Sequence, residues 1–260
     1  MARSVFYYHR QRSNKASKYE RHKEVIKQIY DEHKGRYGYR RITQQMKNMG
    51  YTLNHKTVLK LMREMNLKGL KRKIRYNSYK GEIGEIAENL INRDFTADSP
   101  NKKWATDLTQ IKIKDKWIYL SPILDMFNGE IISYSLSSNP DTKLVISMLE
   151  KAFCKFKSVE GIIIHSDRGV QYQSKEYKQI VEKHKMQISM SRKGNCYDNA
   201  MIESFFGIMK TELLYNQTFE SQSEFIEELH KYIYYYNNIR IKNRLNGKSP
   251  VQYRTFKAAV

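Results

Sequence analysis

Residues 104–109 read Trp104-Ala105-Thr106-Asp107-Leu108-Thr109, a stretch that predicts the first strand of a sheet and carries an acidic residue. Two more acidic residues stand in defined settings further along the chain. Asp167 follows the apolar run 162–164, which predicts a buried strand, and Glu203 lies in the first turns of a predicted helix. Thirty-five residues separate Asp167 from Glu203. Two aspartates on strands and one glutamate on a helix can converge on a pair of divalent cations.

Strand and helix patterns alternate around this first strand, and their order predicts the fold class. We expect strands at residues 104–113, 117–127, 131–137, 162–165 and 188–190, and helices at residues 142–156 and 174–185. Three antiparallel strands, a crossover helix and then parallel strands alternating with helices describe a mixed α/β sheet. This order resembles the ribonuclease H-like folds, so we expect a mixed five-stranded sheet with flanking helices.

The formal net charge of +20 is concentrated at the start of the chain. Residues 1–80 contain 22 Lys and Arg against 5 Asp and Glu, a net charge of +17, whereas residues 81–260 contain 25 against 22, a net charge of +3. Such asymmetry indicates a polyanion-binding module joined to a nearly balanced domain. A solubilising basic tail is the alternative interpretation, but the segment also has the apolar periodicity of helices, which solvated tails lack.

The basic segment predicts a small all-α module. Helices are expected at residues 16–33, 39–48 and 54–65, with glycine-containing turns between them and Asn54 as the cap of the third. The last two of these helices fit a helix-turn-helix, in which the early residues of the later helix face the major groove of DNA. The candidate DNA contacts are His55, Lys56 and Lys60, with Lys71, Arg72 and Lys73 on phosphates. A three-helix bundle that packs against the other domain and binds nothing is the alternative.

The chain is therefore expected to have three parts. Residues 1–80 form the helix-turn-helix module, residues 81–96 a linker helix with a stripe of Ile and Leu, and residues 97–260 the larger domain. No apolar signal segment follows Met1, and no window approaches ~18 consecutive apolar residues, so we expect a cytoplasmic protein without a membrane span. The chain contains 2 cysteines, too few for a disulfide framework or a cysteine zinc site.

Three sequence blocks together resemble a known enzyme family. They are residues 104–109, residues 165–172 (His165-Ser166-Asp167-Arg168-Gly169-Val170-Gln171-Tyr172), and residues 194–200 (Gly194-Asn195-Cys196-Tyr197-Asp198-Asn199-Ala200) running into Glu203-Ser204-Phe205-Phe206. In order and spacing they are similar to the catalytic blocks of DDE transposases of the retroviral-integrase superfamily. The greatest similarity is to the OrfB-type product of bacterial insertion sequences with two overlapping reading frames. Residues 236–240 and 245–250 resemble the closing signature of that family, so the resemblance spans nearly the whole chain.

The resemblance implies a transposase that cleaves the ends of an insertion sequence and joins them to another DNA strand. It also implies that Asp107 bridges two metal ions, with Asp167 completing one site and Glu203 the other. Carboxylates without a His or Cys cluster suit Mg²⁺, for which Mn²⁺ can substitute. The implied partners are double-stranded DNA, as terminal inverted repeats and as target, further copies of the chain, and an upstream-frame OrfA-type protein or fusion.

Three basic residues near Glu203 are further candidate DNA contacts. Lys210 follows Glu203 by seven residues, which is two helical turns, and so shares its helix face. A lysine there can hold a phosphate beside the metals, and the family that the chain resembles places a basic residue at this spacing. Arg192 and Lys193 lie in a glycine-containing loop before the helix and are expected to contact DNA as a flap.

Alternatives stay open for residue roles and for function. We interpret Asp125 as a strand-end surface or turn residue, and His165 as packed or facing DNA. A catalytically inactive DNA-binding regulator is one other function, against which the three intact acids weigh. A ribonuclease H-like nuclease is another, for which a separate basic module is not expected. Retroviral integrase proper is disfavoured, because residues 1–80 contain no cysteine to complete its zinc module.

Overall fold

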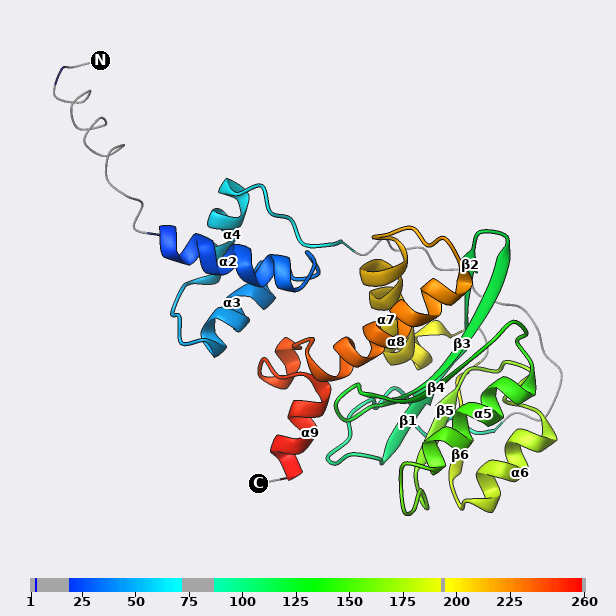
Figure 1. Ribbon diagram of the computed structural model, residues 1–260. Coiled ribbons are helices and arrows are strands. Elements are labelled where there is room, and N and C mark those ends of the chain that lie inside the picture. Colours follow the sequence, from blue (N-terminus) through cyan, green and yellow to red (C-terminus); the bar gives the residue numbers. More distant parts are fainter. Residues whose placement is uncertain (1–2, 4–18, 72–86, 193–194, 259–260) are drawn as a thin grey trace. The chain divides into compact units, whose positions relative to one another are not determined.

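The chain divides into two compact units, residues 1–71 and residues 72–260. The computed structural model describes residues 3, 19–71, 87–192 and 195–258 (Figure 1). The boundary predicted at residue 80 lies outside the described residues. No helix within the described ranges is both long enough and apolar enough to cross a membrane.

The first unit contains three α-helices within residues 19–71. They are α2 (Glu20–Glu32), α3 (Tyr39–Asn48) and α4 (His55–Glu64). Each buries one apolar face against the other two, through Ile26, Ile29, Ile42, Met46, Val58, Leu61 and Met62. The Asn54 side chain accepts a hydrogen bond from the Lys56 N–H at 2.8 Å, which satisfies one of the unpaired donors at the start of α4. The predicted helix pair and its Asn54 cap are confirmed.

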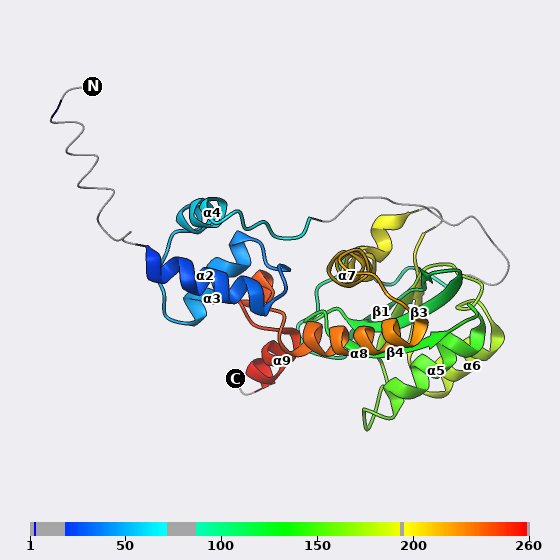
Figure 2. The same cartoon turned by 45° about the horizontal axis from the view of Figure 1, so that its top comes forward.

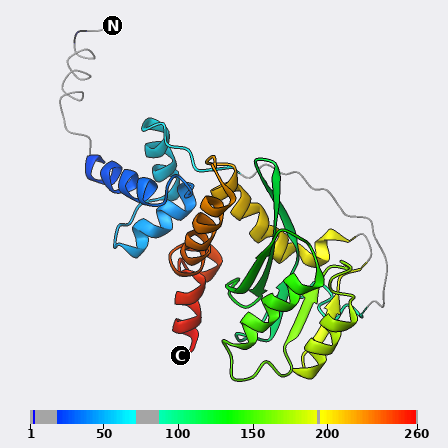
Figure 3. The ribbon, with the colours of Figure 1, turned by 45° about the vertical axis from the view of Figure 1, so that its right-hand side comes forward.

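The second unit contains a mixed sheet of six strands among the described residues. The strands are β1 (Lys103–Thr106), β2 (Thr109–Ile113), β3 (Lys116–Asp125), β4 (Ile131–Ser137), β5 (Ile163–Ser166) and β6 (Gln187–Met190). β3 pairs antiparallel with β1, β2 and β4, whereas β5 pairs in parallel with both β1 and β6 (Figure 3). The α/β class and the mixed sheet predicted from the sequence are confirmed.

The predicted first strand, residues 104–113, is two strands rather than one. β1 pairs with residues 123–125 of β3 and β2 with residues 116–120, so both lie along the edge of β3 opposite β4. The break lies at Asp107, whose Oδ1 accepts a hydrogen bond from the Leu108 N–H at 2.7 Å. That N–H group is therefore not available for hydrogen bonding between strands. The sheet therefore has six strands where five were predicted, and the interruption lies at a candidate site residue.

Helices cover both faces of the sheet (Figure 2). α5 (Thr142–Phe153) and α6 (Lys175–Lys183) pack on one face, in the core cluster that contains Trp104. α7 (Ala200–Met209), the π-helical turn η2 (Lys210–Leu214) and α8 (Gln222–Asn238) pack on the other face, in the cluster that contains Ala105. Successive side chains of β1 point to opposite faces of the sheet, so Trp104 packs in one core cluster and Ala105 in the other. The remaining short elements are η1 (Cys196–Asn199), η3 (Asn243–Leu245) and α9 (Pro250–Ala258).

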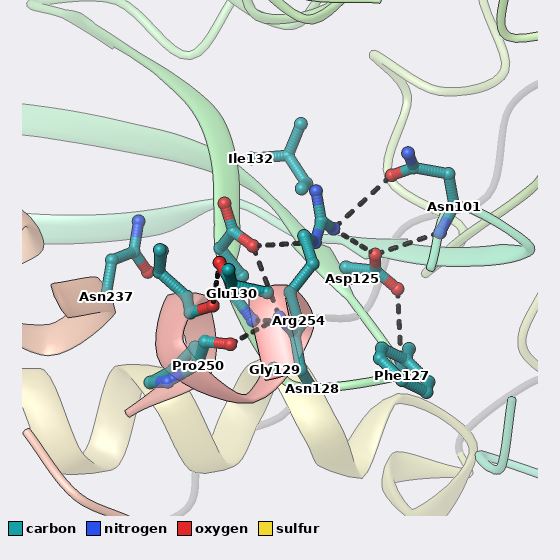
Figure 4. A network of polar contacts seen from close by, with 12 residues as sticks. Asn101, Asp125, Phe127, Asn128, Gly129, Glu130, Ile132, Asn237, Pro250 and Arg254 are labelled. Carbon is teal, nitrogen blue, oxygen red and sulfur yellow. Dashed lines mark hydrogen bonds and ion pairs between the residues drawn. The ribbon is translucent and has the colours of Figure 1, made fainter. Parts of the chain in front are cut away.

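Buried Asp125 ties the end of β3 to the C-terminal helix α9 (Figure 4). Its carboxylate accepts the Asn101 and Phe127 N–H groups, each at 3.0 Å, and pairs with the Arg254 guanidinium. Burial raises the pKa of Asp125, and these donors counteract the rise. The turn interpretation of Asp125 is confirmed. Its predicted surface position was wrong, because Arg254 comes from a distant helix and covers it.

Residues 87–96 form no helix, so the linker helix predicted at residues 81–96 is wrong for this part; residues 81–86 lie outside the described residues. The Leu90 N–H donates to Ser189 Oγ at 2.9 Å, and the Met190 N–H donates to the Glu88 carbonyl at 3.2 Å. The backbone polar groups of this segment bind the end of β6, whereas in a helix they would bond to each other. Tertiary contacts therefore override the apolar spacing of this segment.

Candidate active site

Asp107 and Asp167 lie at the same edge of the sheet. Asp107 directly follows β1, and Asp167 directly follows β5. These strands pair in parallel with Ala105 opposite His165, so the two aspartates come two residues later at matching positions. In open α/β sheets, ligands bind at the carboxyl ends of parallel strands. The structure thus brings the two strand-borne acids together where a ligand is expected.

The two carboxylates share a partly buried environment. Burial raises the pKa of Asp107 well above its ordinary range, and the charges of Asp167 and Glu203 raise it further, whereas Lys210 lowers it. Burial also raises the pKa of Asp167, and the Gly169 N–H, which donates to Asp167 Oδ1 at 2.9 Å, counteracts that rise. Acids grouped in this way favour a bound proton or a bound cation.

Glu203 and Lys210 reach the aspartates from the helical side. The apolar face of α7 packs against the sheet, and Glu203 lies half-buried in the first turn, where its charge acts on Asp107. The sequence predicted that Lys210 continues the helix of Glu203, but Lys210 instead begins the π-helical turn η2. Such turns often occur at functional sites. Burial lowers the pKa of Lys210, and the charge of Asp107 counteracts this. All four predicted residues therefore share one electrostatic neighbourhood.

The donor chemistry of this neighbourhood fits a hard divalent cation, because carboxylate oxygens are the ligands that such ions prefer. The pKa of Asp107 is raised because the site is buried and two further acids lie nearby. A cation bound there would balance the negative charge of these acids. Within residues 19–71, 87–192 and 195–258, no three His, Cys, Asp or Glu side chains are gathered closely enough to ligate a single ion. The acids thus form a shared electrostatic site and not a closed three-carboxylate cage.

Tyr172 is a neighbour of the aspartates that was missed from the sequence. Its side chain is fully buried, and its hydroxyl lies 3.4 Å from Thr106 Oγ1, one residue before Asp107. Burial raises the pKa of Tyr172 well above its ordinary value, and the charges of Asp107 and Asp167 raise it further, so the phenol keeps its proton. Its place at the end of the block 165–172, five residues after Asp167, was a signal in the sequence, but no role was assigned to it.

Arg192 is bonded within the protein. Its Nε donates to Asp198 Oδ2 at 2.9 Å, and its Nη2 donates to Asp198 Oδ1 at 3.0 Å. Hydrogen bonds from Arg192 lower the pKa of Asp198, whose side chain is fully buried and was also missed from the sequence. The next residue, Asn199, is buried too, and its amide makes no hydrogen bond within the described part of the chain. Lys193 lies outside the described residues.

Known protein families match most of this chain. Residues 97–196 and residues 203–257 match two integrase core domain families, and residues 18–75 match an HTH-like domain. The InsK protein for insertion sequence element IS150 of Escherichia coli is 46% identical over 97% of this chain and 89% of its own length. The transposase for insertion sequence element IS904 of Lactococcus lactis is 40% identical over 95% of this chain and 99% of its own length.

The chain belongs to the insertion-sequence transposases. Its integrase core is the one that the sequence blocks predicted, and its HTH-like domain is the one that the helix pattern of the basic segment predicted, so the family assignment is confirmed. The transposase is accordingly an enzyme of the DDE transposase and integrase class.

Solved structures similar to the transposase share its fold. The HTLV-2 integrase catalytic core domain in complex with magnesium, in its trimeric form, has a TM-score of 0.50 at 21% identity, covering 60% of the transposase and 98% of that chain. A chain in the structure of the simian T-cell lymphotropic virus intasome in complex with PP2A regulatory subunit B56 gamma has a TM-score of 0.51 at 18% identity, covering 88% of the transposase and 74% of that chain. At these identities the likeness shows the fold alone.

The HTH-like unit of the transposase exposes its described candidate DNA contacts. His55 and Lys56 lie exposed in the first turn of α4, Lys60 lies exposed one turn later, and Lys71 is exposed at the end of the unit. Arg72 and Lys73 lie outside the described residues. The opposite face of α4 is buried, so this helix presents a basic face to solvent. Contact of these residues with DNA stays a prediction.

Proposed function

We propose that the transposase cleaves and joins DNA strands at insertion-sequence ends, with Asp107, Asp167 and Glu203 as its metal-binding carboxylates. One observation carries this proposal: the charges of Asp167, Glu203 and Lys210 all act on the partly buried Asp107. Grouping ionised acids away from water costs free energy. A divalent cation would offset that cost and supply the chemistry that a transposase needs.

Two Mg²⁺ ions, replaceable by Mn²⁺, would each be held by a pair of these carboxylates. Asp107 would belong to both pairs, Asp167 to one and Glu203 to the other. Mg²⁺ keeps several waters and is commonly held by one or two carboxylates plus substrate phosphates, so it does not require three carboxylates around one ion. When bound, such ions activate the attacking oxygen and neutralise charge on the phosphate.

Other groups of the protein would orient the DNA and exclude water. Lys210 is assigned to a phosphate of the DNA end, because it lies where it interacts with Asp107 and can neutralise a nearby phosphate oxygen. Tyr172, protonated and fully buried next to Thr106, keeps water from the inner side of the aspartates. Charge interactions with the phosphate are stronger in such a dry setting than in water.

The HTH-like unit is assigned to the terminal inverted repeats of the element. The net charge of +17 within residues 1–80 supports this, because neutralised phosphates supply most of the affinity of DNA-binding proteins. The assigned contacts are His55, Lys56, Lys60, Lys71, Arg72 and Lys73, with Lys193 as a further DNA contact. The Arg192 side chain stays half-exposed after pairing with Asp198 and is assigned to a further phosphate contact.

The reaction itself implies an assembly. Joining two element ends needs two active sites, so at least two copies of the transposase would act together on DNA. An upstream-frame OrfA-type protein, or a fusion with it, would supply further DNA binding. Activity should therefore be compared with and without that upstream-frame protein.

Three single variants test the site: Asp107→Asn, Asp167→Asn and Glu203→Gln. On duplexes that carry the inverted repeats, with Mg²⁺ or Mn²⁺, each should lose cleavage and joining by about 10³-fold or more, with end binding unchanged. Asp115→Asn, in the exposed turn between β2 and β3, is the matched control and should keep full activity. Full strand transfer by any of the three site variants would show that the assignment is wrong.

The same assay separates the other functions. Wild-type protein that binds ends but never cleaves them, with metal and the upstream-frame protein present, would indicate an inactive regulator. Preferential cleavage of RNA–DNA hybrids over duplex DNA would indicate a nuclease of the ribonuclease H type.

A further inference from the structure

The buried carboxylate of Asp198 binds two separate parts of the chain, the segment 87–96 and Arg192 in the loop that precedes α7. Its Oδ2 accepts from Asn89 Nδ2 at 3.0 Å, from the Arg192 N–H at 3.0 Å and from Arg192 Nε at 2.9 Å. Its Oδ1 accepts from Arg93 Nε and from Arg192 Nη2, each at 3.0 Å. The Asp198 side chain is fully buried, whereas Arg93 and Arg192 are half-exposed. The carboxylate is therefore held by two charged partners in a fixed orientation.

The same loop is fastened to the residues that flank Asp167. The Ser191 N–H donates to the Ser166 carbonyl at 2.9 Å, and Arg168 Nε donates to the Ser191 carbonyl at 2.8 Å. Ser191 adjoins Arg192 in the chain. A continuous path of bonds thus leads from both neighbours of Asp167 to Asp198.

His165 adds a second link between β5 and Asp198. Its Nε2 lies 2.9 Å from the Asp198 carbonyl oxygen, which can only accept, so Nε2 carries the proton. The other ring nitrogen, Nδ1, lies 2.8 Å from Ser189 Oγ. The Ser189 hydroxyl in turn accepts the Leu90 N–H at 2.9 Å. These contacts confirm the packed interpretation of His165 and occupy both of its ring nitrogens.

We propose that Asp198 is a positioning residue for Glu203: it fixes the start of α7 relative to the strand end that carries Asp167. Asp198 lies in η1, which leads directly into α7, and Glu203 is five residues further on. Because a short stretch of helix is rigid, an anchored start determines where the Glu203 carboxylate lies. The inference rests on the proposed function, in which Glu203 is a metal ligand.

Outer contacts of this kind commonly govern metal affinity. Removing a partner that orients a ligand typically costs about 10–100-fold in metal binding. Such a partner bonds directly to the metal-binding side chain, whereas Asp198 would act on Glu203 through the backbone of α7. Its effect should therefore appear as weaker metal binding, and not only as lower stability.

Asp125 provides a matched comparison for a purely structural role. It is also fully buried, pairs with Arg254 and accepts backbone N–H groups. Asp125 lies opposite Trp104, near the start of β1 and at the other end of that strand from Asp107. If buried ion pairs serve stability alone, Asp125→Asn and Asp198→Asn should act alike.

The test measures Mn²⁺ binding by calorimetry, without DNA, on full-length transposase carrying Asp198→Asn, Asp125→Asn or Glu203→Gln. We expect Asp198→Asn to weaken Mn²⁺ binding by about 10-fold or more and to speed amide hydrogen exchange at residues 200–205. Asp125→Asn should lower the unfolding temperature and leave the Mn²⁺ affinity of the folded protein unchanged. Arg93→Gln, which removes one half-exposed partner, should weaken Mn²⁺ binding less and serves if Asp198→Asn does not fold.

Wild-type Mn²⁺ affinity in folded Asp198→Asn would overturn the inference, as would wild-type affinity in Arg93→Gln where Asp198→Asn is unfolded. An equal loss of affinity in Asp125→Asn would also overturn it. The proposed function fails separately, if Glu203→Gln keeps both Mn²⁺ binding and strand cleavage. A loss in Glu203→Gln with none in Asp198→Asn refutes the positioning role alone.

Discussion

Asp107 and Asp167 are held side by side by the parallel pairing of β1 and β5, each one residue beyond the end of its strand. Burial raises the pKa of both carboxyls, and the charge of Asp167 adds to the rise at Asp107. Two like charges at one sheet edge cost free energy when no cation balances them. Replacing either aspartate by a neutral residue should therefore raise the stability of the metal-free protein and lower its catalytic activity.

Asp107→Asn should stabilise the metal-free transposase at neutral pH by about 1 kcal/mol. A carboxyl whose pKa is raised by folding contributes stability that is fully present below its ordinary pKa and is lost as the pH rises through the raised pKa. Wild-type protein should lose unfolding free energy across that rise. Asp107→Asn should lose less, because it has no charge to bury. Thermal unfolding in EDTA at a series of pH values checks this.

Excess Mg²⁺ should reverse this order, because ions that bind only the folded wild-type carboxylates stabilise it by mass action. Asp115→Asn, which changes an exposed turn residue, should match wild type in both conditions. A steeper loss of stability with pH in Asp107→Asn than in wild type would contradict the prediction.

Lys210→Gln should slow strand cleavage by about 10²–10³-fold, as for loss of one group that stabilises transition-state charge. Lys210→Arg keeps the positive charge and should retain more activity than Lys210→Gln. Lys112→Gln, an exposed lysine on β2, is the control and should leave the rate unchanged. Single-turnover cleavage of a labelled end duplex measures the chemical step. Equal rates for Lys210→Gln and wild type would remove Lys210 from the site.

Lys60→Gln should weaken binding to duplex DNA through loss of one phosphate contact. The slope of log affinity against log salt concentration should fall in magnitude by roughly 1. Lys27→Gln is the control, because Lys27 on α2 is also exposed but pairs with Asp31 at 2.9 Å. Titrations of DNA binding at several salt concentrations give both slopes. An unchanged slope for Lys60→Gln would show that α4 does not present Lys60 to the phosphate backbone.

Arg240→Met should destabilise the second unit by about 3–5 kcal/mol, because it leaves buried Glu212 without its charged partner. Arg240 Nε lies 2.8 Å from Glu212 Oε2 and Nη2 lies 2.7 Å from Oε1, and both side chains are buried. The double variant Glu212→Met with Arg240→Met should recover much of the loss, since no unpaired charge remains. Urea unfolding of the wild type, Arg240→Met and the double variant measures the three free energies of unfolding. Loss of the surface pair Lys231–Glu228, as the control, should cost only about 0–1 kcal/mol.

Short-range features of the fold were predictable from the sequence. The Asn54 cap of α4 needs only its own side chain and the backbone N–H two residues later. The turn between β2 and β3 is similarly local. In the turn between β3 and β4, Gly129 supplies the positive φ of 71° that an Asn-Gly turn requires. Alternating and helical apolar spacings predicted most elements, because the sheet and the helices bury one face each.

Long-range choices were not predictable. The apolar spacing near residue 90 predicted a helix, but Ser189 of β6 takes the Leu90 N–H instead. The sequence predicts that Arg192 contacts DNA, but it did not predict that the Arg192 guanidinium also binds Asp198. Both outcomes depend on a partner whose position only the folded chain decides.

The sequence by itself determined the family, the α/β class and the three acids on which the site is built, because motif order and residue periodicity are local properties of the chain. Tertiary structure alone decided that the first strand breaks at Asp107, that Tyr172 lies buried near the aspartates, and that Asp198 binds the loop before Glu203. Those features arise where backbone donors and buried charges must find partners across the fold. Hydrogen bonding inside a low-dielectric interior, and not residue pattern, sets them.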